Sequence, residues 1–294
     1  MSTLRELKSR IGSVASTQKT TSAMKMISSA KMRKATGGLQ RLSPYRNMVK
    51  HVISHLLLTD QEFSSPLISQ REVKHIALLA FGSDDGLCGA FNINIFKQLL
   101  TTITDVRKQY GSDVKITVIP IGKKLTKAAS KMTVTNVDVE NVTLNTRSDY
   151  DQLHEFTTMM RRRFLDGTYD QVDVLYMHFV STSRQRFVRE QMLPVSYEAL
   201  AEQVDAKLAA QPCLFEPDAN AIFNSVLPLH LKAMMQEVFT ESAASEQAAR
   251  VMAMQTASDN AKELLDELNL EYNKLRQENI TTELLDILGG QVQR

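Results

Sequence analysis

The feature that most constrains this sequence is one helical pattern that covers most of its last quarter. From about Asp218 to Leu288, apolar residues recur at the three- and four-residue spacing of a single helix face. After Pro228, which predicts a kink, such a helix would run roughly 90 Å at 1.5 Å per residue. That length exceeds a compact domain of this size, so the helix must pair with something. Gly289-Gly290 predicts its end, because glycine adopts the left-handed C-cap conformation cheaply.

The first segment, from Ser2 to about Leu58, is the partner that the chain itself offers. Thr3 and Glu6 have capping-box spacing, and a heptad of apolar positions follows, with a polar and small-residue interruption at 18–28. Proline removes a backbone donor, so Pro44 predicts a bend near residues 40–44. Residues 1–50 carry eleven basic side chains and one acid, whereas residues 241–294 carry ten acids and five bases. These opposite charges favour pairing of the two helices.

The middle of the chain has a different pattern, in which short apolar runs alternate with amphipathic stretches. We expect strands at 76–81, 114–121, 172–180 and 187–195, and helices at 92–110 and 150–166. Strands that alternate with helices predict a small α/β sheet. Residues 59–73 and 194–217 are expected to be connectors, and residues 132–147 fit neither pattern clearly.

The composition excludes several classes of protein. A hydrophobic content of 43 % is too high for a disordered chain, and no apolar run approaches the ~20 residues that cross a bilayer. The N-terminus does not resemble a signal peptide, since basic residues separate its apolar ones. Two cysteines cannot form a disulfide framework, which favours a reduced, cytoplasmic setting.

No motif points to catalysis. The turn at 83–92 lies between an expected strand and an expected helix, where a phosphate site would lie in a doubly wound sheet. However, both glycine-rich phosphate motifs are absent, and Asp84 and Asp85 would repel a phosphate. The six histidines show no metal-ligand spacing, and Cys88 has no base nearby in the sequence. We therefore expect no catalytic residue, no cofactor and no metal.

The basic first helix leaves three alternatives open. Its charge could be a solvated face, could bind nucleic acid, or could contact an acidic protein surface. Methionines such as Met24, Met26 and Met32 interleave with the basic residues, and their flexible side chains favour the contact with protein. Three classes of protein also stay open for the chain as a whole: a nucleotide-dependent α/β enzyme with accessory helices, a nucleic-acid-binding coiled coil, and a static structural linker.

Four stretches carry more specific motifs, namely Thr17–Met26 with Ala30–Lys34, Ser83–Asn92, Phe215–Asp218, and the run from Ala244 to Glu283. In order and spacing they resemble the gamma-subunit family of F-type ATP synthases over the whole chain, most weakly at 123–150 and 195–214. Asp85 stands where that family usually has a basic residue, and Gln291 where it usually has alanine. The chloroplast-type insertion with its regulatory cysteine pair is absent.

The resemblance implies a non-catalytic rotor shaft, the central stalk of a rotary motor for ATP synthesis and hydrogen ion transport. The expected fold class is α/β, with a long antiparallel coiled coil of N- and C-terminal helices (1–58 and 218–290) plus a central Rossmann-like α/β domain (74–193). In that family the shaft turns inside a ring of alpha and beta subunits, while the epsilon subunit and the c ring hold the α/β domain.

The resemblance also implies roles for particular residues. Met24 and Lys25 would face the acidic lever of the beta subunit, and the catch region of beta would contact Arg276, Gln277, Thr281 and Glu283. Phe215 and Glu216 would lie towards epsilon and the c ring. No mitochondrial presequence is seen, which favours a bacterium, and the resemblance then implies a peripheral protein on the cytoplasmic face of the inner membrane. It would meet the membrane only through the c ring and would bind no nucleic acid.

Overall fold

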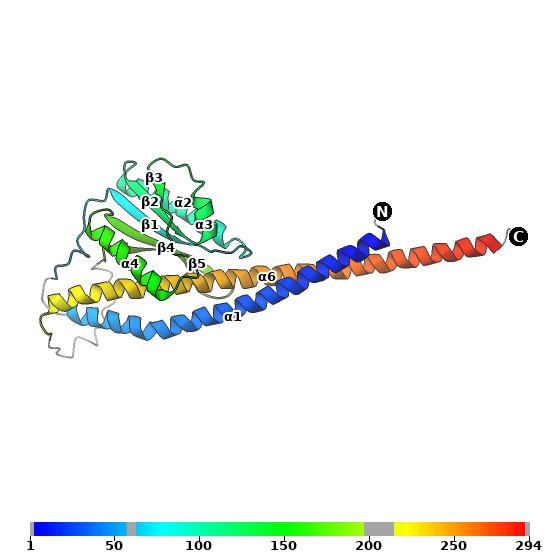
Figure 1. Ribbon diagram of the computed structural model, residues 1–294, viewed down its shortest axis with the longest axis horizontal. Coiled ribbons are helices and arrows are strands. Elements are labelled where there is room, and N and C mark those ends of the chain that lie inside the picture. Colours follow the sequence, from blue (N-terminus) through cyan, green and yellow to red (C-terminus); the bar gives the residue numbers. More distant parts are fainter. Residues whose placement is uncertain (1–2, 58–62, 197–214, 292–294) are drawn as a thin grey trace.

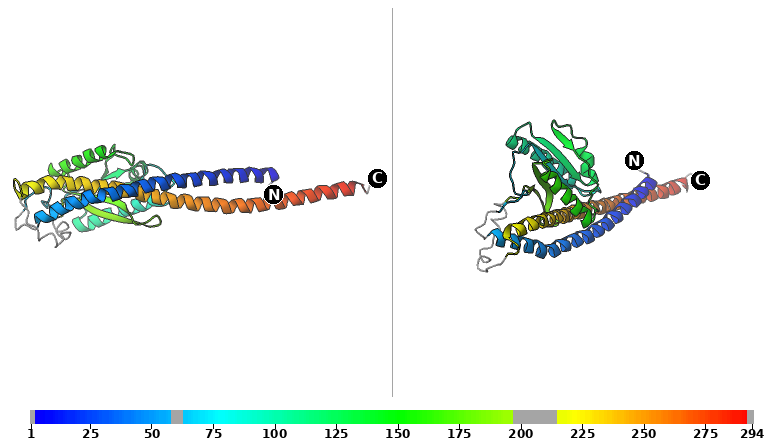
Figure 2. Two further views of the ribbon diagram at one scale, coloured as in Figure 1. Left: turned by 90° about the horizontal axis from the view of Figure 1, so that it is seen from below. Right: turned by 60° about the vertical axis from the view of Figure 1, so that its left-hand side comes forward.

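Two long helices dominate the computed structural model, which describes residues 3–57, 63–196 and 215–291, with side chains as far as residue 285. Helix α1 (Leu4–Leu57) has 54 residues and helix α6 (Ala219–Gln291) has 73. They lie side by side and antiparallel over most of the length of α1 (Figures 1 and 2). The pairing expected from the two apolar patterns is confirmed.

The start of α1 follows the expected capping box. The Thr3 amide donates to Glu6 Oε2 at 2.9 Å, and the Glu6 amide donates to Thr3 Oγ1 at 3.3 Å. Both groups would otherwise be unpaired amides of the first turn. The local sequence therefore fixes this helix end.

Breaker residues inside the long helices bend them but do not end them. Helix α1 is continuous through Pro44, and Figure 1 shows it bowed in the half that leads to its C-terminal end. Beside Pro44, between the two helices, lies a cavity of about 250 Å³. Helix α6 continues through Pro228 and also through Gly289 and Gly290 to Gln291, so the predicted stop is wrong. Glycine costs only about 1 kcal/mol in a helix, which a long helix tolerates.

A five-stranded sheet packs against one end of this coiled coil, in the order β3-β2-β1-β4-β5. The pairs β3–β2, β2–β1 and β1–β4 are parallel, and β5 is antiparallel to β4. The strands are β1 (His75–Phe81), β2 (Lys115–Ile121), β3 (Val137–Val139), β4 (Gln171–Phe179) and β5 (Gln185–Leu193). The connecting helices are α2 (Phe91–Tyr110), α3 (Lys123–Ala129) and α4 (Tyr150–Leu165). The four expected strands and two expected helices are present, while β3 and α3 were not predicted.

The two faces of the sheet have separate cores. Alternate residues of β1 point to opposite sides, as the pleat requires. Ile76, Leu78 and Ala80 pack towards α2 and α3, whereas Ala77, Leu79 and Phe81 pack towards α4 and the coiled coil. The second core includes fully buried residues of α6, among them Phe223, Leu227 and Leu231. The first part of α6 therefore pairs with α1 in the coiled coil and also covers one face of the sheet.

Candidate functional site

Hydroxyl groups at the start of the polar interruption in α1, and just before it, bond within the helix. They donate to backbone carbonyls four residues earlier, at Ser13, Ser16, Thr17, Thr20 and Thr21. These side chains therefore need no partner on α6, and the helix stays slim here. Met24 and Lys25 follow on the same helix and are partly buried, while Met26 and Ile27 are 65 % and 56 % exposed.

The structure brings this part of α1 next to the turn at 83–92. Met24, Ile27 and Lys31 line one wall of a notch of about 340 Å³, and residues 85–87 and Arg250 of α6 line the others. Leu87 is 62 % exposed beside it. Two motifs far apart in the sequence thus share one surface, with exposed apolar side chains and charges of both signs.

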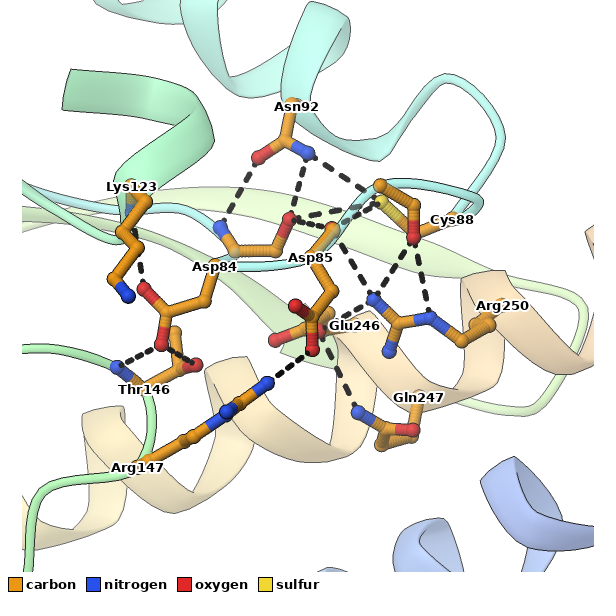
Figure 3. A network of polar contacts seen from close by, with 12 residues as sticks. Asp84, Asp85, Cys88, Asn92, Lys123, Thr146, Arg147, Glu246, Gln247 and Arg250 are labelled. Atoms are coloured by element: carbon orange, nitrogen blue, oxygen red, sulfur yellow. Dashed lines mark hydrogen bonds and ion pairs between the residues drawn. The ribbon is translucent and has the colours of Figure 1, made fainter. Parts of the chain in front are cut away.

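The two aspartates of this turn, Asp84 and Asp85, bond to other residues of the same chain (Figure 3). Asp84 Oδ1 accepts from the Lys123 amide at 3.0 Å, and its Oδ2 accepts from the amide and hydroxyl of Thr146 at 3.2 and 2.6 Å. Asp85 forms an ion pair with Arg147 at 2.7 Å, and this hydrogen bond lowers the pKa of the Asp85 carboxyl. The Lys123 amide, which begins α3 at the carboxyl end of β2, is thereby occupied by a carboxylate.

A second set of contacts ties the turn to α6. The Arg250 guanidinium donates to the backbone carbonyls of Asp85 and Gly86 at 3.3 and 3.2 Å, and pairs with Glu246 at 2.8 Å. The side chains of Arg250 and Glu246 are only 8 % and 6 % exposed. Burial raises the pKa of Glu246, and the charge of Arg250 opposes that shift. Sequence reasoning missed this contact, because nothing in the spacing links Arg250 to residues 85 and 86.

The end of α6 is a single bare helix. Every side chain from Arg276 to Leu285 is exposed, and Figure 1 shows this part of α6 extending past the first residues of α1. Arg276, Gln277, Thr281 and Glu283 all lie here, and the Thr281 hydroxyl donates to the Gln277 carbonyl at 2.8 Å. Ile280, Leu284 and Leu285 are 46–63 % exposed among them. The four predicted contact residues therefore share one accessible segment.

Phe215 and Glu216 lie just before the other end of α6. Phe215 packs at the edge of the core that joins the sheet to the coiled coil, and Glu216 is exposed. Asp218 then caps α6 by accepting from the Ala221 amide at 2.8 Å. Because α6 is 73 residues long, the structure separates these two residues from the bare tip by roughly 100 Å.

Two negative findings concern the described residues alone. No helix there combines the length and apolar character needed to cross a bilayer. No group of three or more His, Cys, Asp or Glu side chains in that part of the chain is arranged to hold a metal ion. Cys88 is buried, and its sulfur accepts from Asn92 Nδ2 at 3.4 Å.

Comparison with known proteins covers the whole chain. The family model described as "ATP synthase" matches residues 3–292. The ATP synthase gamma chain of Bacteroides thetaiotaomicron is 38 % identical over 301 residues, with 100 % of both chains covered. That of Phocaeicola vulgatus is 39 % identical over 290 residues, with 99 % of both covered. That of Cupriavidus pinatubonensis is 34 % identical over 292 residues, again with 99 % of both covered.

Solved structures show the same fold at lower identity. The rotor of the Euglena gracilis mitochondrial ATP synthase in rotational state 1 matches with a TM-score of 0.60 and 17 % identity, covering 94 % of this chain and 98 % of that one. A chain from the OSCP/F1/c-ring structure of the same enzyme in rotational state 3 matches with a TM-score of 0.64 and 19 % identity, covering 98 % and 93 %. By its full-length sequence match, and with a fold that agrees, this chain belongs to the ATP synthase gamma chain family.

Proposed function

We propose that this chain is the central shaft of a rotary ATP synthase and performs no chemistry itself. It would couple ion-driven rotation of a membrane c ring to the conformational cycle of catalytic beta subunits. The single observation that best supports this role is the asymmetric shape of the molecule. Two paired helices carry a sheet at one end, and at the other end one of them continues as a bare, exposed helix.

Different parts of the chain would have different mechanical tasks. Residues 1–58 and 218–290 would form the shaft, residues 74–193 the foot, and 59–73 and 194–217 the connectors. The foot, with Phe215 and Glu216, would face the epsilon subunit and the c ring on the cytoplasmic face of a bacterial inner membrane. The shaft would stand inside the ring of alpha and beta subunits.

Particular side chains would then meet the beta subunits. Met24 and Lys25 lie beside the notch between α1 and the turn at 83–92, where exposed apolar and basic groups suit an acidic lever. Arg276, Gln277, Thr281 and Glu283 lie on the bare tip, accessible to a loop of beta. Because the shaft differs from face to face, each angle would favour a different beta conformation through differential contacts, as any coupling between sites requires.

The geometry of the turn argues against a nucleotide-dependent enzyme. A phosphate site at this position needs free backbone amides. The Lys123 amide donates to Asp84, the Lys124 amide to the Ser83 carbonyl, and the Ser83 amide to Asn92 Oδ1. These three groups are already used, and the nearest carboxylates would repel an anion.

Charge reversal on α1 tests the lever contact. Replacing Lys19, Lys25, Lys31 and Lys34 together with Glu should leave the fold intact, since all four are exposed or partly exposed. Assembled with alpha and beta subunits, the variant should hydrolyse ATP more slowly, because acidic surfaces would repel one another, and in the whole ATP synthase it should pump ions more slowly. A matched control replaces four exposed lysines of the foot with Glu, at Lys97, Lys108, Lys127 and Lys131, and should leave ATP hydrolysis by the alpha–beta–gamma assembly unchanged, because the foot would lie outside the alpha–beta ring. Full coupling in the α1 variant would refute the lever contact.

A further inference from the structure

The sheet contacts the first half of α6 along most of its length. The shared core packs α6 against the sheet from Ala219 to Phe239, and Glu241 then hydrogen-bonds to His178 of β4 at 2.6 Å. Further along, at Glu246–Ala253, the turn at 83–92 rests on the same helix. Arg250 lies 31 residues after Ala219, the first residue of α6, which is about 46 Å along the axis.

The upper contact combines a buried polar clamp with the packing of Ala249 against the core beside the turn. Arg250 holds two backbone carbonyls of the turn and one carboxylate of its own helix, as Figure 3 shows. Hydrogen bonds from a charged donor are directional and stronger than neutral ones. They fix both the height and the rotational setting of α6 against the turn.

Hydrogen bonds and an ion pair hold the shape of the turn at 83–92. Asn92 bridges to Ser83 through its amide oxygen at 3.0 Å and its nitrogen at 2.7 Å. Asp84 and Asp85 fasten it to Thr146 and Arg147. Gly89, at φ +58°, comes so close to α6 that an added Cβ would lie 3.6 Å from that of Ala253. A force on the sheet is therefore passed to α6 without first deforming the turn.

We propose that Arg250 is a positioning residue that locks the α/β unit to the shaft at this upper level, so that torque applied to the foot reaches α6 without slip. The inference rests on the proposed function. The shared core and the Glu241–His178 contact hold the sheet to α6 nearer the connectors. Arg250 adds the contact with the turn beyond them, about 46 Å from Ala219 along the axis, where it resists twisting of α6 against the sheet.

Replacing Arg250 with Gln tests the clamp. The variant keeps a polar side chain but loses the ion pair and the fork that spans both carbonyls. In the assembled complex, amide hydrogen exchange in residues 83–92 should rise about tenfold or more, as expected when hydrogen bonds from a charged group are lost. ATP hydrolysis by the unloaded alpha–beta–gamma head should persist, while ions pumped per ATP against an imposed gradient should fall. Unchanged exchange and unchanged pumping would overturn the proposal.

Two further variants separate a mechanical role from a merely structural one. Arg250→Lys keeps the charge but cannot span both carbonyls, so its pumping ratio should lie between those of wild type and Arg250→Gln. Lys262→Gln, an exposed charge removed from the same helix, should change neither exchange nor pumping.

A cross-link provides the rescue. With Cys88 and Cys213 replaced by Ser, Gly89→Cys and Ala253→Cys bring two Cβ atoms within the separation that a disulfide spans. Because position 89 has φ +58°, which strains any L residue, the same cysteine pair with Arg250 intact is the reference for the pumping ratio. Added to Arg250→Gln, the oxidised cross-link should restore the pumping ratio, and its reduction should abolish the gain. A cross-link that forms without restoring the ratio would refute the clamp.

A different result would contradict the proposed function. If the wild-type chain forms no ATP-hydrolysing complex with alpha and beta subunits, the shaft role itself is wrong. If wild type and Arg250→Gln couple equally well under load, only the clamp is wrong.

Discussion

At the scale of single residues, α1 and α6 hold three basic side chains close together in a partly buried setting, at Arg46, Lys50 and His230. Arg46 of α1 forms an ion pair with Glu237 of α6. Burial, and then the charge of Arg46, lowers the pKa of Lys50, although Glu190 of β5 acts in the opposite direction. His230 of α6 faces the same region, and its Nδ1 is shut off from solvent. Burial, and secondly the charge of Lys50, lowers the pKa of His230 to about 4.

The His230 shift predicts a loss of stability in acid. Between about pH 6.5 and 4 the unfolded chain protonates this histidine and the folded chain does not, so the free energy of unfolding falls as pH falls. The loss attributable to His230 should reach about 3 kcal/mol near pH 4. Urea unfolding of wild type and His230→Gln at several pH values measures it. Equal slopes with pH in the two proteins would contradict the assignment.

At the scale of elements, the two long helices stay paired as far as the N-terminal end of α1. Leu7 is fully buried, although it lies within the first turns of α1. On α6, Leu268 is 4 % exposed, and no described side chain after it is buried. The seam of the coiled coil therefore ends in a short apolar contact, beyond which α6 is alone.

Removing the Leu7 side chain should open this end of the seam. Leu7→Ala loses a buried side chain and leaves a cavity, at a cost of about 3 kcal/mol. Because the site is at a helix end, we expect local fraying, seen as faster amide exchange in residues 4–14. Met48→Ala, at a position 69 % exposed on the same helix, should change the stability by less than about 0.5 kcal/mol. Comparable exchange in both variants would show that Leu7 does not close the seam.

At the scale of the whole molecule, folding and partner contact occupy different parts of α6. Its first half covers the sheet and holds the turn at 83–92, whereas residues 276–285 bury nothing within the chain. Exposed apolar residues at a bare helix end are typical of a surface that meets other proteins. We therefore expect the fold to form without the tip, and we propose that the tip serves assembly.

Truncation after Leu275 tests this separation. The shortened chain should keep the same far-UV circular dichroism signal per helical residue. Its Tm should move by no more than about 4 °C, because little buried surface is lost. Its complex with alpha and beta subunits should be less stable or generate less torque, measured by subunit dissociation and single-molecule rotation. A large drop in Tm would mean that the tip packs on the rest of the chain.

The sequence determines most of the elements, because helix and strand periodicities are local. The apolar patterns of the long helices, the capping box at Thr3 and four of the five strands follow from residues close together in the chain. The wrongly predicted stop at Gly289-Gly290 shows the limit of this reasoning, since a weak breaker does not end a long helix. The short β3 and α3 lacked a pattern long enough to detect.

Only the tertiary structure decides which distant residues meet. Arg250 and the carbonyls of residues 85 and 86 are some 165 positions apart, and their contact depends on how the sheet seats on α6. The notch beside Met24 and the exposure of the tip likewise depend on the register and relative lengths of α1 and α6. A periodic pattern specifies the face that a helix buries, but the position of its partner along that face comes from the packing of the whole chain.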